Sequence, residues 1–284
     1  MAGFVTISID VELAWGIWDD LTDATLGKIE ALERPIVRRL IGLFDRHEVA
    51  ATWAMVAALA DRPSAEAMPG KPELWYAPEL FEWVQQARVL HEIGSHGGRH
   101  RYFDGFGAGE AREDLKFACD VHARHGLPFK SFVFPRNKVG HTDLLAEVGI
   151  KVYRGVDWAW HERLRRRSRP LGRIANLADK VLPLAPDPVA PRQDGPLVNI
   201  AGSMLYIGRN GLRKLVSAGA LQNKLARGLD AAEHSGRTFH LWFHPSNFYY
   251  RTDEQFAVFD RFLTEIARRR SAGTLAVRRM GDFA

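Results

Sequence analysis

The chain of 284 residues is 46% hydrophobic, which is enough apolar material for one α/β domain or two small ones. Its single cysteine, Cys119, excludes a disulfide framework and a cysteine-based zinc site, and it is consistent with a reducing compartment. The net charge is +5. No run approaches the ~20 apolar residues of a membrane span, and residues 1–3 lead directly into a predicted strand without a leader. A cytoplasmic protein is therefore expected.

Short apolar runs alternate with helical periodicity along most of the chain. The runs predict strands at residues 4–9, 49–55, 91–95, 131–134, 150–153, 197–201, 238–243 and 274–277. Helical patterns cover residues 28–47, 78–86, 109–125, 141–148, 211–234 and 254–269. This alternation indicates a parallel sheet with helices on both faces. We expect one α/β domain over residues 1–284, a closed or nearly closed parallel (β/α) barrel of about seven or eight units.

Residues 155–196 interrupt this rhythm and form a long, proline-rich insertion, after which strand and helix patterns resume. The insertion holds a run of arginines with no acid among them: Arg163, Arg165, Arg166, Arg167, Arg169 and Arg173. Such a cluster is either a solvated face or a contact for phosphates, on a nucleotide or lipid diphosphate carrier or at an anionic membrane surface. Nucleic acid is not expected, because no recognisable nucleic-acid-binding module accompanies the cluster.

Residues that suit a metal site stand at the ends of three predicted strands. His96 and His100 are four residues apart, so both imidazoles can meet one cation of the zinc type on one side of a single turn of chain. Asp10 and Glu12 end the first strand, and strand alternation sends both side chains to the same face. His244 ends a third strand. The chemistry of such barrels gathers at the C-terminal strand ends, which predicts one assembled metal site.

Four motifs along the chain carry a resemblance to a known family. They are Asp10-Val11-Glu12, Ser95-His96-Gly97-Gly98-Arg99-His100, Phe134-Pro135-Arg136-Asn137 and Leu241-Trp242-Phe243-His244-Pro245. In this order they resemble the polysaccharide deacetylase family, also called the NodB-homology family or carbohydrate esterase family 4, over nearly the whole chain. The resemblance implies a distorted (β/α) barrel and removal of N- or O-acyl groups from sugars. It also implies a divalent metal, usually zinc, with cobalt, nickel and manganese as alternatives.

The resemblance assigns roles residue by residue. His96 and His100 match the family's two metal-binding histidines, Glu12 the third ligand and Asp10 the general base. The commonest family motif has two adjacent aspartates, whereas one residue intervenes here, so the roles of Asp10 and Glu12 can also be reversed. His244 matches the late histidine that protonates the leaving amine.

Supporting residues are assigned in the same way. Arg136 resembles the family arginine that orients the base, and its guanidinium is expected to grip Asp10 with two hydrogen bonds. Asp157 and Trp158 resemble, more weakly, the Asp–Trp element that supports this arginine and walls the pocket. His240 has no family counterpart and is interpreted as a packing residue. Three aromatic residues either stack on sugar faces or fill the core: Trp15, Trp18 and Tyr102.

The predicted function is metal-dependent removal of an N-acyl group from a sugar precursor in surface-glycan or nucleotide-sugar metabolism. The expected acyl group is N-acetyl. The precursor would be linked to a nucleotide or a polyprenyl phosphate. The arginine cluster of the insertion could also make peripheral contact with the inner membrane surface. The phosphates would be held by three arginines of the insertion: Arg165, Arg166 and Arg167. Alternatives are an N-deformylase or a non-sugar amidase on the same scaffold, and a non-catalytic carbohydrate-binding relative. The presence of base, ligands and acid together favours the enzyme.

Overall fold

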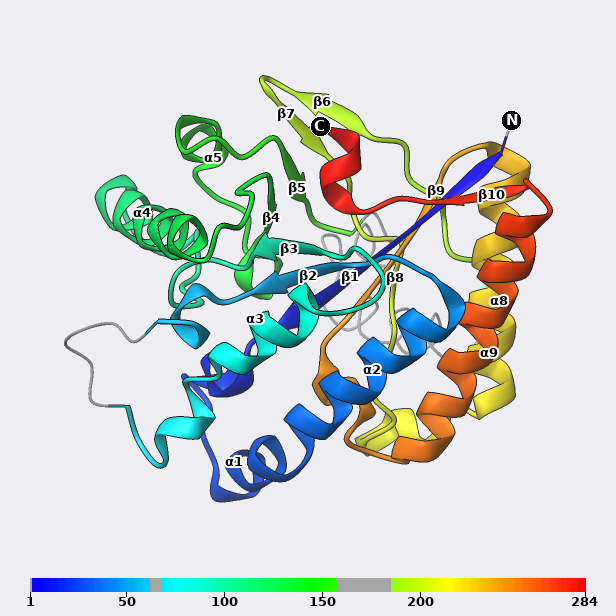
Figure 1. Ribbon diagram of the computed structural model, residues 1–284, viewed down its shortest axis with the longest axis horizontal. Coiled ribbons are helices and arrows are strands. Elements are labelled where there is room, and N and C mark those ends of the chain that lie inside the picture. Colours follow the sequence, from blue (N-terminus) through cyan, green and yellow to red (C-terminus); the bar gives the residue numbers. More distant parts are fainter. Residues whose placement is uncertain (1, 62–67, 158–184) are drawn as a thin grey trace, which may run out of the picture.

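The structure is a computed structural model that describes residues 2–61, 68–157 and 185–284 (Figure 1). The arginine cluster, Trp158 and most of the predicted insertion lie outside these residues. The expectations for Arg165, Arg166 and Arg167 therefore stay predictions.

A curled, mostly parallel sheet forms the centre of the fold (Figure 1). Its strands are β1 (Gly3–Val11), β2 (Thr52–Met55), β3 (Glu92–Ser95), β4 (Ser131–Val133), β5 (Val152–Arg154), β6 (Arg192–Asp194), β7 (Leu197–Asn199), β8 (Met204–Leu205), β9 (Thr238–Phe243) and β10 (Leu275–Val277). Their order is β6-β7-β5-β4-β3-β2-β1-β9-β8, and β10 pairs with the start of β1. Every ladder between these strands is parallel except that of β6 with β7. The long β1 pairs with β2, β9 and β10, and its residues from Val5 to Val11 are all buried.

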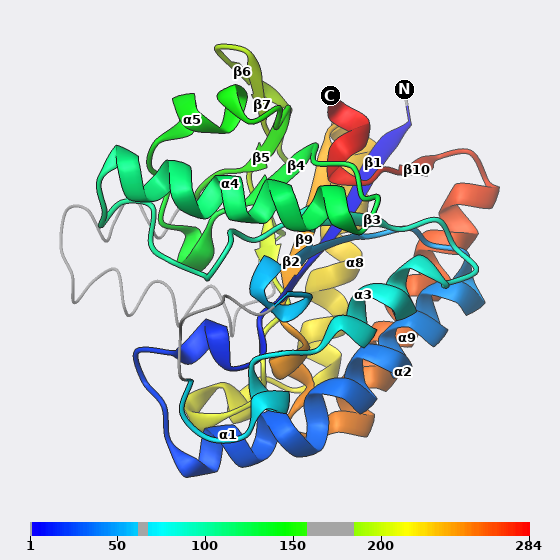
Figure 2. The same ribbon diagram turned by 60° about the vertical axis from the view of Figure 1, so that its left-hand side comes forward.

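Helices surround the curled sheet (Figures 1 and 2). They are α1 (Asp23–Lys28), α2 (Arg34–His47), α3 (Pro78–Gln85), α4 (Ala108–Arg124), α5 (Thr142–Glu147), α8 (Ala218–Ser235) and α9 (Thr252–Ser271). Helix α8 packs on β1 and β9, α9 packs on α8, and α2 packs on α9. Helices α4 and α5 cover β4 and β5 through a separate apolar cluster that includes Leu115, Leu144 and Phe132. None of the helices in the described residues is both long and apolar enough to cross a bilayer.

The predicted alternation of strands and helices is confirmed, and the differences have local causes. Strands β6 and β8 carry no apolar signal of the expected length, because β6 is a polar Arg-Gln-Asp edge strand and β8 has two residues. The helix predicted over residues 28–47 is divided by a π-helical segment, Ile29–Glu33, between α1 and α2. Single π turns inside helices often occur at functional sites, and this one ends at the buried Glu33.

The sheet is curled enough for side chains of distant strands to meet inside it. Strands β5 and β1 are four places apart in the sheet order, which corresponds to about 19 Å in a flat sheet. Arg154 of β5 nevertheless lies 2.6 Å from Asp10 of β1, measured from Nη2 to Oδ2. Since β6 and β8 are the edges of the described sheet, the architecture is the expected distorted (β/α) barrel with an interrupted ladder.

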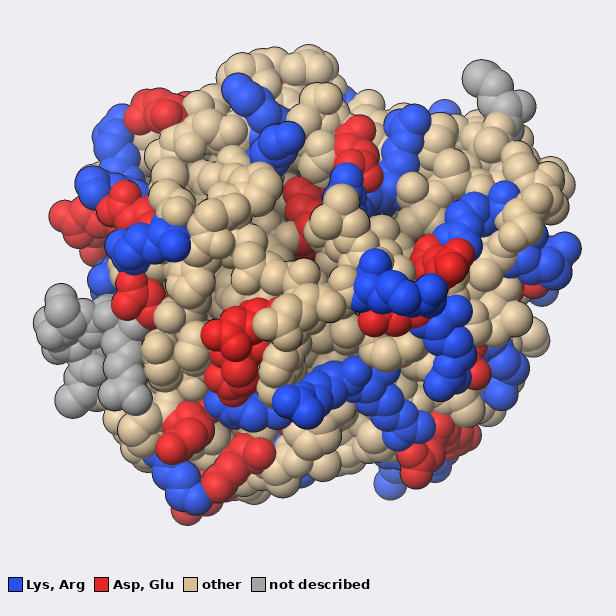
Figure 3. All heavy atoms as spheres, in the orientation of Figure 1, with Lys and Arg blue, Asp and Glu red and all other residues tan. Residues whose placement is uncertain are grey.

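Some of the basic residues on one face of the molecule form a row along a helix. Figure 3 shows Lys and Arg side chains over the region of α2, with acidic side chains close by. Arg34 pairs with Glu79 at 2.6 Å, and Arg39 pairs with Asp253 at 2.6 Å. The Arg34 pair is partly buried, whereas the Arg39 pair is exposed, and an exposed pair contributes ~0–1 kcal/mol, so the outer part of this row has the character of a solvated helix face.

A glycine of α8 lets this helix approach the sheet, and its replacement gives a test of the packing. A Cβ at Gly228 would lie 2.6 to 2.8 Å from three ring carbons of the buried Phe239. We expect Gly228→Ala to lower the free energy of unfolding by about 1–3 kcal/mol, because overpacking outweighs the better helix propensity of alanine. Gly219 of the same helix has nothing nearer than Ser217 Oγ at 4.0 Å, so Gly219→Ala should leave stability equal or higher. Urea unfolding measures both, and equal effects would contradict the close contact.

Candidate active site

The first strand brings two carboxylates to one end of the barrel. Asp10 lies near the end of β1 and is 2% exposed. Glu12 follows the strand and precedes the 3₁₀ helix η1, Leu13–Ile17. The neighbouring strands β2 and β9 fix this part of β1 from both sides. Both carboxylates line one cavity, so they face the same space.

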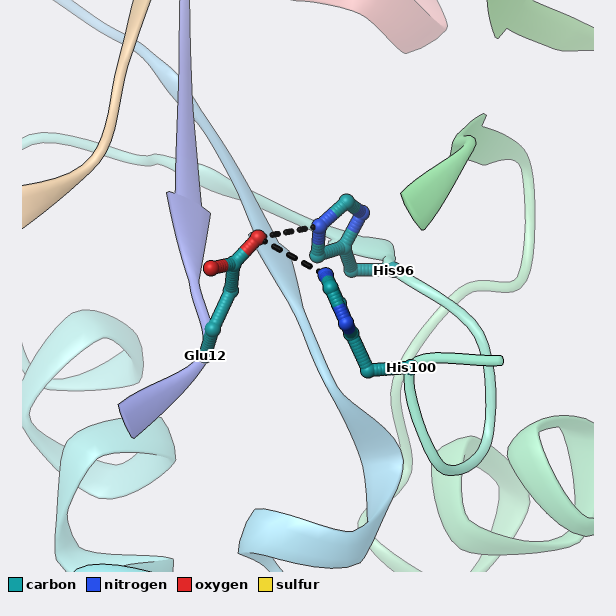
Figure 4. A group of neighbouring side chains, drawn as sticks. All are labelled: Glu12, His96 and His100. Carbon is teal, nitrogen blue, oxygen red and sulfur yellow. Dashed lines mark hydrogen bonds and ion pairs between the residues drawn. The ribbon is translucent and has the colours of Figure 1, made fainter. Parts of the chain in front are cut away.

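Glu12, His96 and His100 meet at one point (Figure 4). Glu12 Oε1 lies 2.9 Å from His96 Nε2 and 2.9 Å from His100 Nε2. Both histidine side chains are fully buried, and Glu12 is mostly buried. The structure therefore brings together the three residues that the sequence predicts as metal ligands.

The loop that carries the two histidines is held by Asp114 of α4. The Asp114 carboxylate accepts hydrogen bonds from the backbone nitrogens of Gly98, at 2.6 Å, and Arg99, at 2.9 Å. Gly97 and His100 have φ values of 79° and 55°, and these left-handed residues turn the chain tightly between the two imidazoles. A Cβ at Gly98 would lie 2.6 Å from the backbone oxygen of Asp114, so the close approach requires glycine.

The tautomer of His96 indicates what the group can hold. His96 Nδ1 lies 2.8 Å from the carbonyl oxygen of Val133, which can only accept, so Nδ1 donates its proton there. In the neutral ring, Nε2 then presents a lone pair to Glu12 Oε1, which is also an acceptor. A cation or an additional proton must lie between two such atoms at 2.9 Å.

The charge states favour a metal in this place. Burial lowers the pKa of His100 and so favours the neutral form that ligates metals. Burial disfavours ionisation of Glu12, but the charges of His244 and His100 outweigh it and hold the pKa of Glu12 well below its ordinary value. One carboxylate and two imidazoles fit a divalent metal of the zinc type and leave further positions open.

His244, at the end of β9, faces both carboxylates. Its Nε2 lies 3.3 Å from Glu12 Oε1 and 3.7 Å from Asp10 Oδ2. Burial favours the neutral ring, but the charges of Glu12 and Asp10 raise the pKa of His244 to about 9. The imidazole can therefore carry a proton beside the carboxylates.

The arginine that grips Asp10 is Arg154, and the prediction of Arg136 for this contact is wrong. Arg154 Nη1 donates to Asp10 Oδ1 at 2.8 Å, and Nη2 donates to Oδ2 at 2.6 Å. Burial disfavours the ionised Asp10, but the charge of Arg154 outweighs it and lowers the pKa of Asp10. Arg136 is half-exposed and instead donates to Gly16 O at 2.9 Å and to Asp19 at 3.0 Å.

The physical reason for this difference is the curl of the sheet, which brings the face of β5 opposite β1. Arg136 has a φ of 53°, within a turn after β4 that directs its side chain to the protein surface. A signal for Arg154 exists in the sequence, since it ends the run 152–154 on the same strand face as the buried Val152.

A hydrogen-bonded chain holds Arg154 from behind. Ser8 Oγ accepts from Arg154 Nη1 at 2.9 Å and donates to His240 Nε2 at 2.9 Å. His240 Nδ1 donates to the carbonyl oxygen of Ile200 at 3.1 Å. Burial lowers the pKa of His240 to about 3, so the ring stays neutral and can accept from Ser8. His240 is thus a member of a polar network, which the packing interpretation missed.

Asp157 of the predicted Asp–Trp element contacts a tryptophan of another strand. Asp157 accepts a hydrogen bond from Trp242 Nε1 at 2.9 Å, and the Trp242 ring lies 4.4 Å from the guanidinium carbon of Arg154. Asp157 therefore supports the arginine through Trp242, a residue of β9. Trp158 lies outside the described residues.

One cavity contains the carboxylates, and a second is lined by residues that follow Glu12 and His100 in the chain. The first, of about 280 Å³, holds the polar groups of Asp10, Glu12 and His244 between partly apolar walls. The other, of about 630 Å³, is mainly apolar. Its walls include the aromatic residues that the sequence suggested for stacking or for the core: Trp15, Trp18 and Tyr102.

Comparisons with known proteins agree in fold. No family model matches the sequence, and no curated protein matches it. A protein from Mycobacterium smegmatis described as a polysaccharide deacetylase superposes with a TM-score of 0.70 at 17% identity, covering 99% of this chain and 88% of the other. One from Pseudomonas aeruginosa, described in the same way, gives 0.67 at 15% identity, with 98% and 88% covered. The Puue allantoinase gives 0.65 at 13% identity, with 98% and 88% covered.

These likenesses extend over nearly the whole chain at low sequence identity, so they establish the fold. The chain has a distorted (β/α) barrel like that of the two proteins described as polysaccharide deacetylases, so the fold that the resemblance implied is confirmed.

The two arginines can be separated by matched substitutions. We expect Arg154→Lys to lower kcat at least tenfold, which is part of the ~10²–10⁴-fold that a general base contributes, because an ammonium cannot hold both Asp10 oxygens. Arg136→Lys should change kcat by less than about threefold, since its contacts are exposed. Steady-state kinetics on the two variants decides between them. A larger loss in Arg136→Lys would return the orienting role to Arg136.

Proposed function

We propose that the protein is a metal-dependent hydrolase that removes an N-acyl group, most of all N-acetyl, from a sugar. The observation that carries this proposal is the meeting of Glu12, His96 and His100 beside the Asp10–Arg154 pair. Amide hydrolysis at a metal requires ligands for the metal, a base for the attacking water and an acid for the leaving nitrogen. The ligand group, Asp10 and His244 can supply these three functions. The fold shared with proteins described as polysaccharide deacetylases supports a sugar substrate.

The chain's own residues divide the work. Glu12, His96 and His100 would hold the divalent metal, which when bound supplies Lewis acidity toward the acyl carbonyl and acidifies water. Asp10 takes the proton of the attacking water while Arg154 fixes the carboxylate in place. The new C–O bond forms as the C–N bond breaks, and His244 gives the departing nitrogen its proton. The product pair is a carboxylate and an amine.

A non-sugar amide is the second candidate substrate. It is favoured by the likeness to an allantoinase, whose name refers to allantoin and not to a sugar. The same residues would act on such a compound, because the groups that attack and protonate do not contact the rest of the substrate. A substrate panel that includes N-acetyl sugars, N-formyl sugars and ureides, with acetate, formate and amine all measured, separates these activities.

Metal content tests the ligand assignment. We expect the purified protein to bind about one divalent metal per chain, with zinc first among the candidates. His96→Ala and His100→Ala should each lose the metal and the activity together, because each removes one of three ligands. Elemental analysis and acetate release are measured on the same samples, and the double variant serves as the metal-free control. Stoichiometric metal in that double variant would contradict the assignment.

The roles of the two carboxylates can be separated in the same assay. Asp10→Asn should keep the metal and lose about 10²–10⁴-fold in activity, because an amide cannot take the proton. Glu12→Gln should instead lower the affinity for the metal, because it removes a charged ligand. If Asp10→Asn loses the metal and Glu12→Gln retains it, the roles are reversed.

The carrier of the sugar is a finer proposal that rests on the basic insertion. A nucleotide- or polyprenyl-phosphate-linked precursor would place its phosphates near Arg165, Arg166 and Arg167. Replacing all three by glutamine should raise KM for a phosphate-linked N-acyl sugar and leave KM for an uncharged one unchanged. Added salt should imitate the change in the wild type, since exposed charges are screened over ~10 Å at 0.1 M. Equal effects on both substrates would contradict phosphate binding and leave the interpretation of the arginine cluster as a solvated face.

A further inference from the structure

The polar cavity beside the reaction centre has a wall that the proposed chemistry does not use. Asp10, Glu12 and His244 form one side of this space of about 280 Å³. The other side comes from α1 and the π-helical segment, from the loop before α8, and from the 3₁₀ helix Pro245–Phe248 with the residues after it. Polar and charged groups of these segments face the cavity: Lys28, Glu33, Asn210, Arg213, Tyr249 and Tyr250.

Two cations on this wall have no carboxylate partner among the described residues. The Lys28 ammonium donates to the hydroxyl of Tyr250 and lies 4.4 Å from the centre of its ring. Tyr250 thus holds Lys28 in place without neutralising its charge. Arg213 lies in the 3₁₀ helix Gly211–Leu215, and its guanidinium forms no hydrogen bond or ion pair with another side chain of the described chain. Both side chains are half-buried and line the same space.

The carboxylates of the cavity are already engaged elsewhere. Asp10 is paired with Arg154, and Glu12 faces three histidines. Glu33 is 3% exposed and accepts a hydrogen bond from the Tyr249 hydroxyl. Burial raises the pKa of Glu33 to about 7, so it carries only part of a negative charge at neutral pH. The wall therefore offers positive charge to whatever occupies the cavity.

We propose that Lys28 and Arg213 bind an oxyanion of the substrate, a phosphate or a carboxylate, within this cavity. A guanidinium can grip such a group with two parallel hydrogen bonds, and an ammonium adds a point charge. The inference rests on the proposed hydrolase function, since it names the class of substrate: an N-acyl compound with an anionic group close to the amide that is cleaved. The space accommodates a group of about one sugar ring, at the lower end of the range for small-molecule sites.

Binding of matched sugars to the full chain tests this proposal. N-acetylglucosamine is the neutral probe, N-acetylglucosamine 1-phosphate carries a phosphate, and N-acetylmuramic acid carries a carboxylate. Isothermal titration calorimetry should show at least one anionic sugar bound about tenfold more tightly than the neutral one. Comparison of the affinities for the two anionic sugars shows whether the site binds a phosphate or a carboxylate. Equal affinity for all three sugars, or no binding by either anionic sugar, would overturn the proposal.

Substitutions then locate the effect. Lys28→Gln and Arg213→Gln should each reduce the preference for the anionic sugar severalfold, and the double variant should abolish it, with the affinity for the neutral sugar unchanged. Arg213→Lys should keep part of the preference, because the charge remains. Lys214→Gln is the matched control, since Lys214 is the adjacent cation, is exposed and does not line the cavity. A preference that survives in the double variant, or that Lys214→Gln lowers equally, would assign it to other cations.

The binding measurement separates this inference from the proposed function. If the anionic preference is present and follows Lys28 and Arg213 while no acyl group is released from any N-acyl compound, the hydrolase proposal fails and the anion site stands. If acetate is released with no preference between charged and neutral sugars, the anion site fails alone. Thermal unfolding of each variant, compared with the wild type, shows that the loss is not a loss of fold.

Discussion

The buried ion pair between Asp10 and Arg154 is the interaction on which the site depends. Removing two charges from water costs several kcal/mol for each ion, and attraction offsets this only where geometry and further hydrogen bonds are favourable. Here the two terminal nitrogens of the guanidinium each donate to one carboxylate oxygen. Ser8 accepts a further hydrogen bond, and the ring of Trp242 lies against the guanidinium. Because the pair joins β5 to β1 across the interior, it links two distant strands of the curled sheet and fixes the orientation of the carboxylate.

The remaining groups are held by backbone as much as by side chains. The carbonyl of Val133 on β4 sets the tautomer of His96, and Asp114 on α4 binds the loop that carries both histidines. The three candidate ligands therefore come from two segments, the end of β1 and this loop, and both segments rest on packed elements that keep the side chains close to one geometry. The two cavities differ in character, since one holds the carboxylates, His244 and two cations, and the other is largely aromatic.

Most of the architecture could be predicted from the sequence because it depends on local pattern. The buried strands are short apolar runs, and their alternation with amphipathic helices leaves few arrangements other than a parallel barrel. Features without a local pattern were not predicted. The polar edge strand β6 depends on its partner β7, and the π turn before Glu33 has no compositional signal. The meeting of Glu12, His96 and His100 was predictable, because they are metal-binding residue types at predicted strand ends and the family resemblance groups them.

The choice between Arg136 and Arg154 marks the boundary between sequence and tertiary structure. The sequence by itself determined which strands exist, which of them end in acids or histidines, and that these ends share one edge of a barrel. It could not determine which arginine meets Asp10, because that depends on how far the sheet curls and on the turn after β4, which directs Arg136 to the surface. The tertiary structure also decided that Ser8, His240 and Trp242 support the pair and that Lys28 and Arg213 share a cavity with it, since these contacts join segments far apart in the chain.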